Sequence, residues 1–474
     1  MNNTTRIFLN GFYNSQNRRC LKSIARSLGH RRHLSTRASV HLASMIPPTT
    51  MDSIAIMPEV TYAMTNKASK HMLDGLQRSC DVFRQINPKG DEYKAVLLLK
   101  AQTLSELNLF QDCVKDLSLI LRLSEKDEDK FQIQLARSKM NWLQSNFDEA
   151  LEDANAISNI APQVIFYNVP LYQGIALNSL GLCKMAKLDL KDIDLLLLKD
   201  SDIEPPIAQM KDVGEVVDTF KMASSVLRNA YTRNKQENDQ QIVTVGLASA
   251  ISCINLGVSE IMNVLIKSQC IENHVAYDHA MQAWRDALNI LDEIAKLDAS
   301  LNEKQKFLMK ITQVQAYLNM TWTLLYSSSY VSKDTKPLKE STLKTASEYA
   351  GSALKIANVL SNDNIENVDA QNALGRALTL VASCYSRAGS AVTAEGLLQT
   401  AIEKLKQDPN PLHTLDARSA YIAYFKLFSN WEKRSADTDK SKIEALDLDE
   451  TLGKWKGASS IYSGCSFITI DQLS

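Results

Sequence analysis

The residue types that most often carry catalysis or bind metals are scattered along this chain. None of the eight cysteines forms a Cys-x-x-Cys pair. Beyond residue 51, the two closest histidines, His274 and His279, are five residues apart, so their rings do not share a helical face. The chain contains no Gly-x-Gly-x-x-Gly, Gly-x-x-x-x-Gly-Lys-[Ser/Thr], His-Glu-x-x-His or Gly-x-Ser-x-Gly motif. These observations predict a protein that is not an enzyme and that uses neither a cofactor nor a metal.

The cysteines and the acidic runs have simpler explanations. The cysteines occur singly, mostly at apolar positions of expected helices, which predicts buried free thiols and fits a reducing compartment. The acidic runs at 124–130 and 447–450 fall in expected linkers, where charged side chains are usually solvated.

The composition favours long helices. Only 27 of the 474 residues are glycine or proline, under 6%, against an average of about 12%. Hydrophobic residues make up 45%, which is enough for a packed core, and the net charge of −1 gives no reason to expect nucleic acid as a partner. No run of 18 apolar residues exists, and the most apolar stretch, 251–266, contains Glu260. We therefore predict no membrane span.

The first 51 residues resemble an address signal. They hold seven arginines and one lysine but no acidic residue, and 18–29 places Leu21, Ile24 and Leu28 on one helical stripe. This pattern resembles a mitochondrial transit peptide, and 31–39 resembles the Arg-x-Leu-Ser pattern that matrix proteases cut, which would place the cut after Leu34. The expected location is the mitochondrial matrix. There are two alternatives. One is a plastid transit peptide, and the other is an uncleaved basic tail that binds membrane or RNA on a cytoplasmic protein.

Beyond the first 60 residues, one unit recurs. In the stretches around 97–123, 130–162 and 170–197, a small residue is followed twelve positions later by a second small residue, as Ala101 is by Cys113 and Gly174 by Ala186. Similar second helices occur at 276–294 and 343–360, and 378–405 repeats the whole unit. The pattern predicts at least six helical hairpins, which exceeds the three or so units that a stable stack needs.

The repeated unit resembles the tetratricopeptide (TPR) repeat. The family pattern places small residues at repeat positions 8 and 20, where the two helices touch, Gly at 15, an aromatic at 17 and Pro at 32. Phe147, Ala150, Ala154 and Pro162 match it, as do Ala382, Gly389, Ala394 and Ala401. The resemblance implies an all-α fold, a right-handed TPR-like α-solenoid. The spacing between units departs from 34 residues, which indicates inserts such as 327–341.

These patterns divide the chain into five parts. They are the transit peptide and linker (1–51), an N-terminal TPR-like segment (60–200), a hinge region (201–240), a C-terminal TPR-like segment (241–434) and a tail (435–474). Residues 60–86 and 414–434 read as flanking helices, which often cap a solenoid.

The resemblance also implies which residues face the concave groove, at repeat positions 5, 9 and 12. In the first three units the partner-binding candidates are Leu98 and Gln102, then Leu135, Lys139 and Trp142, then Ile175 and Asn178. In the last unit the same positions hold Thr379, Ser383 and Ser386. Trp142 is the natural anchor for a partner, although it could instead pack against the next hairpin.

The groove residues favour one kind of partner. The TPR co-chaperones hold acidic carboxyl-termini with a Lys/Asn/Lys/Arg clamp, but position 5 is leucine in all three N-terminal units, namely Leu98, Leu135 and Leu171. Such a groove suits an apolar or amphipathic helix or peptide. We therefore expect a non-enzymatic scaffold that binds a protein, by family analogy in the assembly of organelle complexes. An organellar RNA-binding repeat protein and a cytosolic adaptor or co-chaperone are the alternatives, and the sequence gives no oligomeric state.

Overall fold

The computed structural model describes the chain in ten stretches, and all further structural statements refer to them. They are residues 42–66, 68–162, 169–188, 210–237, 241–267, 274–297, 301–331, 338–405, 411–429 and 434–452.

Every regular element in the described stretches is a helix. In chain order they are η1 (Ala43–Met45), α3 (Pro48–Ile54), α4 (Pro58–Thr65), α5 (Lys70–Ile86), α6 (Asp91–Glu106), α7 (Phe110–Leu123), α8 (Asp127–Leu143), α9 (Phe147–Ile160), α10 (Val169–Ala186), α12 (Met210–Glu237), α13 (Ile242–Lys267), α14 (His274–Ala295), α15 (Glu303–Val331), α16 (Glu340–Asp363), α17 (Val368–Arg387), α18 (Ala391–Lys404), α19 (Pro411–Phe428) and α20 (Ser435–Leu452). The predicted all-α fold is confirmed for these residues.

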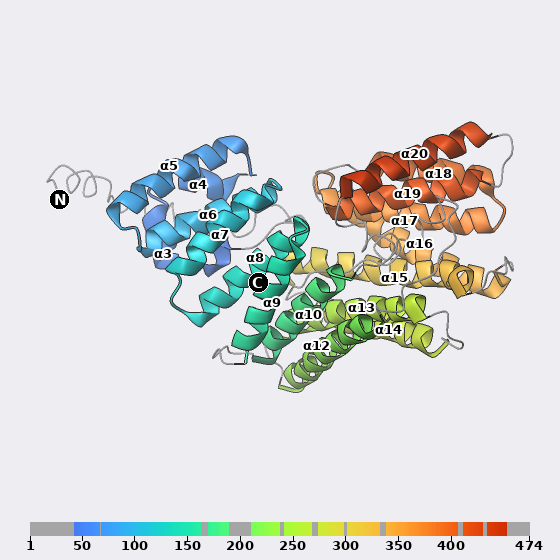
Figure 1. The fold of residues 1–474 in the computed structure, drawn as a ribbon, viewed down its shortest axis with the longest axis horizontal. Coiled ribbons are helices and arrows are strands. Elements are labelled where there is room, and N and C mark those ends of the chain that lie inside the picture. The colour runs from blue at the N-terminus through green and yellow to red at the C-terminus, as the bar shows by residue number, and fades with distance from the viewer. Residues whose placement is uncertain are drawn as a thin grey trace.

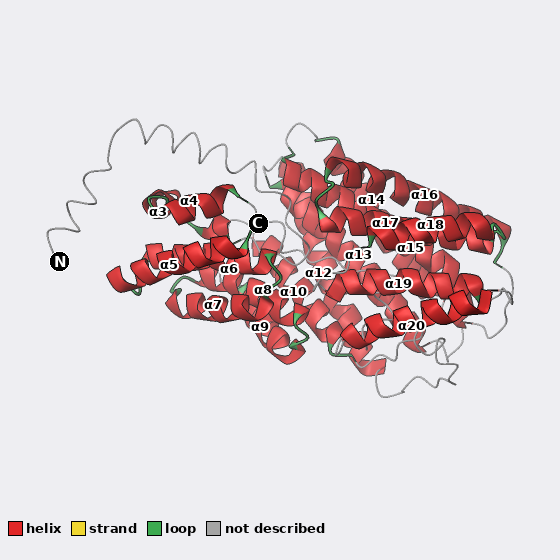
Figure 2. Ribbon diagram, turned by 90° about the horizontal axis from the view of Figure 1, so that it is seen from above, coloured by secondary structure: helices red, strands yellow, loops and turns green. Residues whose placement is uncertain are grey.

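From α4 onward, each described helix packs against the next one along the chain. In Figure 1 the blue-to-teal helices and the orange-to-red helices form the two ends of this succession, and α10 to α14 lie between them. Figure 2 shows the same helices from above, with α3 and α4 on one side of α6 and α7 on the other. The order in space therefore follows the order in sequence, as expected of stacked helical units.

Contacts between alternate helices define two sides of the stack. α8 contacts α10, α10 contacts α13, and the pairs α13–α15, α15–α17 and α17–α19 follow. We call these helices, together with α6, the inner helices, and we call the helices between them outer. The inner helices lie closer to one another than the outer ones do, since outer helices mainly contact their inner neighbours.

Three hairpins share one turn. Asn108, Ser145 and Gly389 each have positive φ, of 58°, 64° and 79°, and each stands two residues before the next helix. The residue after each of them donates its backbone N–H to a carbonyl five residues back, over 2.9 Å in all three turns. This is the six-to-one bond of a Schellman-type helix end, which needs a left-handed residue. The same turn thus sets the angle between the helices in the hairpins α6–α7, α8–α9 and α17–α18.

Small residues bring the two helices of each hairpin together. The Cys113 thiol lies 3.2 Å from the carbonyl oxygen of Ala101, and the Ser138 hydroxyl lies 2.8 Å from that of Ala150. Each pair is separated by twelve residues. Such contacts between a side chain and a backbone carbonyl require that neither helix carry a bulky side chain at the crossing point.

The first two hairpins also carry equivalent ion pairs. Lys100 lies 3.0 Å from Asp116, and Arg137 makes a two-pronged contact with Asp153 at 2.6 and 2.9 Å, each pair being sixteen residues apart. Burial raises the pKa of both carboxyls above its usual value, an effect that the cationic partners oppose. Each pair therefore links the two helices of its hairpin one turn from the small-residue contact.

The third expected hairpin differs from the structure. The repeat pattern places Gly174 and Ala186 on the two helices of one hairpin with a turn between them, but both lie in α10, which continues through Gly181 to Ala186. A Cβ at Gly181 would lie 2.8 Å from the Phe220 ring, and one at Gly174 would lie 2.3 Å from Leu227, both on α12. The glycines allow α10 and α12 to approach closely, so the expectation of a turn was wrong. The second helix expected around 190–193 lies outside the described residues.

The region 201–240, expected to be a hinge, contains α12 in its described part. This long helix packs between α10 and α13. The side of α12 that packs against its neighbours buries Val213, Phe220 and Leu227, and most of its exposed residues are polar. The division of the chain at a hinge region stays a prediction, and the described part of this region is a packed helix.

One stretch in the described residues, Ile242–Asn263, is long and apolar enough to cross a membrane, with a mean hydropathy of 1.8. It belongs to α13, and 83% of its most apolar window is buried. The helix contacts α10, α12, α14 and α15. A core helix of a helical stack has the same length and composition, so the predicted absence of a membrane span stays a prediction.

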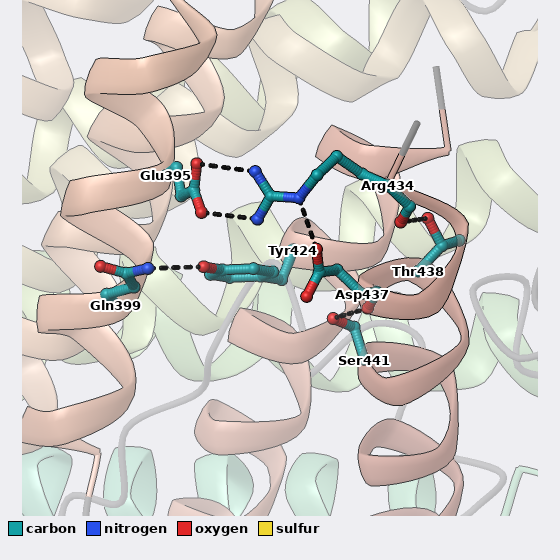
Figure 3. A network of polar contacts seen from close by, with 7 residues as sticks. All are labelled: Glu395, Gln399, Tyr424, Arg434, Asp437, Thr438 and Ser441. Atoms are coloured by element: carbon teal, nitrogen blue, oxygen red, sulfur yellow. Dashed lines mark hydrogen bonds and ion pairs between the residues drawn. The ribbon is translucent and has the colours of Figure 1, made fainter. Parts of the chain in front are cut away.

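Within the part of the chain predicted as a tail, residues 435–452 form α20, which packs on α19. Arg434 holds α20 in place. Its guanidinium donates to both carboxylate oxygens of Glu395 in α18 and contacts Asp437 (Figure 3). The guanidinium also lies 4.3 Å from the centre of the Phe428 ring. The rest of the predicted tail, 453–474, lies outside the described residues.

Candidate functional site: the inner face of the stack

The groove candidates lie on the inner helices, and their side chains are buried except for the half-buried Ser386. In the first hairpin, Leu98 is 2% exposed and Gln102 is 3% exposed. The Gln102 side-chain oxygen accepts hydrogen bonds from the backbone N–H groups of Leu42 and Ala43, at 3.2 and 3.0 Å. The chain's own segment before α3 therefore occupies the inner face of α6.

The candidates of the next two units are also buried. Leu135, Lys139 and Trp142 on α8 are 7%, 7% and 3% exposed, and Ile175 and Asn178 on α10 are 8% and 1% exposed. None of these side chains is an open surface. Their role in binding a partner stays a prediction, and a ligand could reach them only after local rearrangement.

A polar contact joins α10 to α13 on this face. The Asn255 amide donates a hydrogen bond of 2.9 Å to the side-chain oxygen of Asn178. Both residues are buried. Asn178, a groove candidate, thus links two inner helices.

The carboxyl-terminal half of the inner face carries a buried charged network. Arg376 of α17 lies 2.9 Å from the Asp416 carboxylate of α19 and donates a bond of 2.6 Å to Gln315 of α15. Gln315 in turn donates to Asn319 at 2.6 Å. Arg376 and Asp416 are 8% and 3% exposed. The network therefore ties three successive inner helices together through one guanidinium.

A second buried pair lies near the starts of α17 and α19. Nε2 of His413 is 2.8 Å from the Asp369 carboxylate, and both side chains are at most 3% exposed. A carboxylate beside an imidazole can orient the ring and fix its tautomer. In the described stretches, no group of three or more His, Cys, Asp or Glu side chains is placed to hold a metal.

Sequence reasoning missed these two clusters. Thr379 and Ser383, the groove candidates of α17, are buried and donate to backbone carbonyls of their own helix. Arg376 lies one turn before Thr379 and reaches Gln315 and Asp416 instead. The sequence signal for this network was Arg376, a charged residue on the otherwise apolar buried face of α17, because a buried charge needs a partner.

The described cysteines are consistent with the expected buried thiols. Cys80, Cys113, Cys183, Cys253 and Cys384 are all free and buried. Burial raises the pKa of the Cys80 thiol to about 12 and that of Cys253 to about 11. Such thiols are poor nucleophiles at neutral pH.

No family model and no curated protein matches this chain.

Proposed function

We propose that the protein is a non-enzymatic scaffold of the TPR type, whose hairpins stack into an α-solenoid and whose inner face binds a protein or peptide. The observation that carries the proposal is the geometry shared by α6–α7, α8–α9 and α17–α18. All three have the same left-handed turn, and their small residues twelve positions apart are buried. Repeated hairpins of this kind present equivalent inner positions side by side, which suits recognition of an extended or helical peptide.

The net charge of the chain supports a protein partner over nucleic acid. Seven of the 53 basic residues lie before the expected cut after Leu34, which leaves 46 basic against 54 acidic residues, a net charge of −8. The buried Arg376 is paired with Asp416. Proteins that bind RNA through a repeat surface need a basic surface along it. A filter-binding assay addresses this alternative, and salt-sensitive RNA binding at submicromolar concentration would favour it.

The proposed location is the mitochondrion, with a role in assembling organelle complexes. It is supported by the basic, acid-free character of residues 1–51. Sequencing the amino-terminus of the protein isolated from cells tests it. A new terminus after Leu34 is expected, and an intact Met1 would favour a cytosolic adaptor.

The binding role itself is tested by site-specific photo-crosslinking. A photoreactive residue on an inner helix should capture a protein partner, and one on an outer helix should not. The captured protein is then identified by mass spectrometry, so the partner does not have to be chosen in advance.

A further inference from the structure

The segment from Leu42 to Ile54 lies on the inner face of α6, with η1 and α3 both in contact with that helix. It is anchored by three buried aliphatic side chains, Leu42, Ile46 and Ile54, which are at most 6% exposed. Between the anchors, residues 47–49 and 52–53 are exposed. Ala43, Met45 and Met51 are partly buried against the same core, so a few buried and partly buried side chains hold the segment, and five of its residues are exposed.

The polar part of the contact involves the backbone of the segment. The N–H groups of Leu42 and Ala43 stand at the start of the turn η1, where a helix has no acceptor of its own for its first donors. Gln102 supplies the acceptor for both. Its amide nitrogen donates to Glu106 at 2.9 Å, which directs the amide oxygen toward the segment. Because Gln102 binds backbone groups, a peptide of another sequence can make the same bonds.

The segment is separate from the packing that closes the end of the stack. α5 already covers the next face of α6, and α4 packs on α5. α3 has seven residues, no side-chain cap at its start, and exposed prolines at 47 and 48. Short, weakly capped elements with few buried side chains open at lower free energy than core helices.

We propose that residues 42–54 are an exchangeable internal ligand of α6. The external ligand of the same surface is then a peptide from another protein that carries two aliphatic side chains four residues apart and starts a helical turn at the first of them. This inference rests on the proposed function, because it names the kind of peptide that the inner face takes and the segment that such a peptide must displace.

Hydrogen exchange on the unmodified full chain gives the first test. The amides of residues 49–55 should exchange at least tenfold faster than the central amides of α6 and α7, through an opening that leaves those helices protected. Equal rates for the segment and for α6 would overturn the proposal, since the segment would then open only with the whole hairpin.

Binding of a synthetic peptide in trans gives the second test. The probe is a fluorescein-labelled peptide of residues 42–56, added to the full chain and to the variant Ile46→Asp/Ile54→Asp, whose own segment is released. The attached segment competes at a high effective concentration. The released variant should therefore bind the probe at least tenfold more tightly than the parent, measured by fluorescence anisotropy.

Matched variants locate the probe. Adding Gln102→Ala to the released variant should weaken probe binding at least tenfold, because two hydrogen bonds lose their acceptor. The control variant Asp52→Asn/Ser53→Ala alters exposed positions of the segment and should bind the probe as the parent does. Equal binding by parent and released variant, or loss of the helical circular dichroism of the released variant, would contradict the proposal.

The hydrogen-exchange and peptide-binding experiments need no external partner, so their results are independent of the crosslinking test of the proposed function. If crosslinking on the inner face captures a protein while the segment does not exchange, only the internal ligand is refuted. If the probe exchanges but no protein is captured, the scaffold function is refuted and the exchange stands.

Discussion

The hydroxyl of Ser138 in α8 donates a hydrogen bond of 2.8 Å to the carbonyl oxygen of Ala150 in α9. The thiol of Cys183 in α10 lies 3.5 Å from both the Ser138 hydroxyl and the same carbonyl oxygen. Three helices therefore meet at one point, and each contributes a small residue there. The crossing point sets how closely a hairpin packs and where the next helix lies upon it.

The substitution Ala150→Trp should destabilise the protein. Ala150 is fully buried at the crossing point, so an indole ring must push the helices apart. Overpacking of this kind costs about 1–3 kcal/mol. Urea denaturation followed by circular dichroism measures it. Asn155→Trp, at an exposed position of the same helix, is the control and should leave the midpoint unchanged. An unchanged midpoint for Ala150→Trp would refute the repeat register.

The Arg376–Asp416 pair should show strong coupling in a double-mutant cycle. Asp416→Leu alone leaves a buried guanidinium without its carboxylate, and breaking such a pair costs about 3–5 kcal/mol. Arg376→Met combined with Asp416→Leu removes both charges and should recover most of that loss. Denaturation midpoints of the two single variants and the double variant give the coupling. Additive effects would show that the two charges do not depend on each other.

The buried thiols should resist alkylation in the folded protein. Burial raises the pKa of Cys80 from 9.0 to about 12, which lowers its thiolate fraction at pH 8 by about a thousandfold. Iodoacetamide labelling resolved by peptide mass spectrometry should therefore modify Cys80 and Cys253 only after unfolding. Rapid labelling of either in the native state would contradict their placement.

The same shift predicts how stability depends on pH. The folded state binds the Cys80 proton more tightly than the unfolded state does. Protonation of the Cys80 thiol therefore stabilises the fold, and this stabilisation is complete below pH 9. It is lost as the pH rises from 9 toward 12. Cys80→Ala should therefore weaken the fall in melting temperature over that range relative to the parent.

Arg434→Ala should loosen α20 while leaving the rest of the stack intact. The side chain joins Glu395 of α18 to Asp437 of α20 (Figure 3). It also covers the Phe428 ring. Amides of 435–452 should exchange faster with deuterium, and those of α6 to α9 should not change. Lys440→Ala, at an exposed position of the same helix, is the control. Unchanged exchange in α20 would mean that its packing on α19 suffices.

Local features of the hairpins could be predicted from the sequence because they depend on nearby residues. The turns at Asn108, Ser145 and Gly389, and the contacts twelve residues apart, follow from helical spacing alone. Gly181 failed as a turn signal because a glycine serves close helix packing as well as a turn, and its packing partner, Phe220, is 39 positions further along the chain.

Whether the inner face is open or covered by other parts of the chain could not be predicted in the same way. The register predicts a groove position for Gln102, but it does not predict that residues 60 positions earlier cover this side chain. The pairing of Arg376 with Gln315 spans 61 residues. Such contacts depend on how successive units stack, and the spacing within one unit carries no information about that.

The most direct test of the inner face as a binding surface is photo-crosslinking in the cells that make the protein. p-Benzoylphenylalanine is placed at the half-buried inner positions Glu106 and Ser386, and at the exposed outer positions Lys115 and Asn155. We expect a discrete crosslinked protein from the inner positions and little from the outer ones. Crosslinks to a protein from the outer positions alone would contradict the proposed binding role of the inner face.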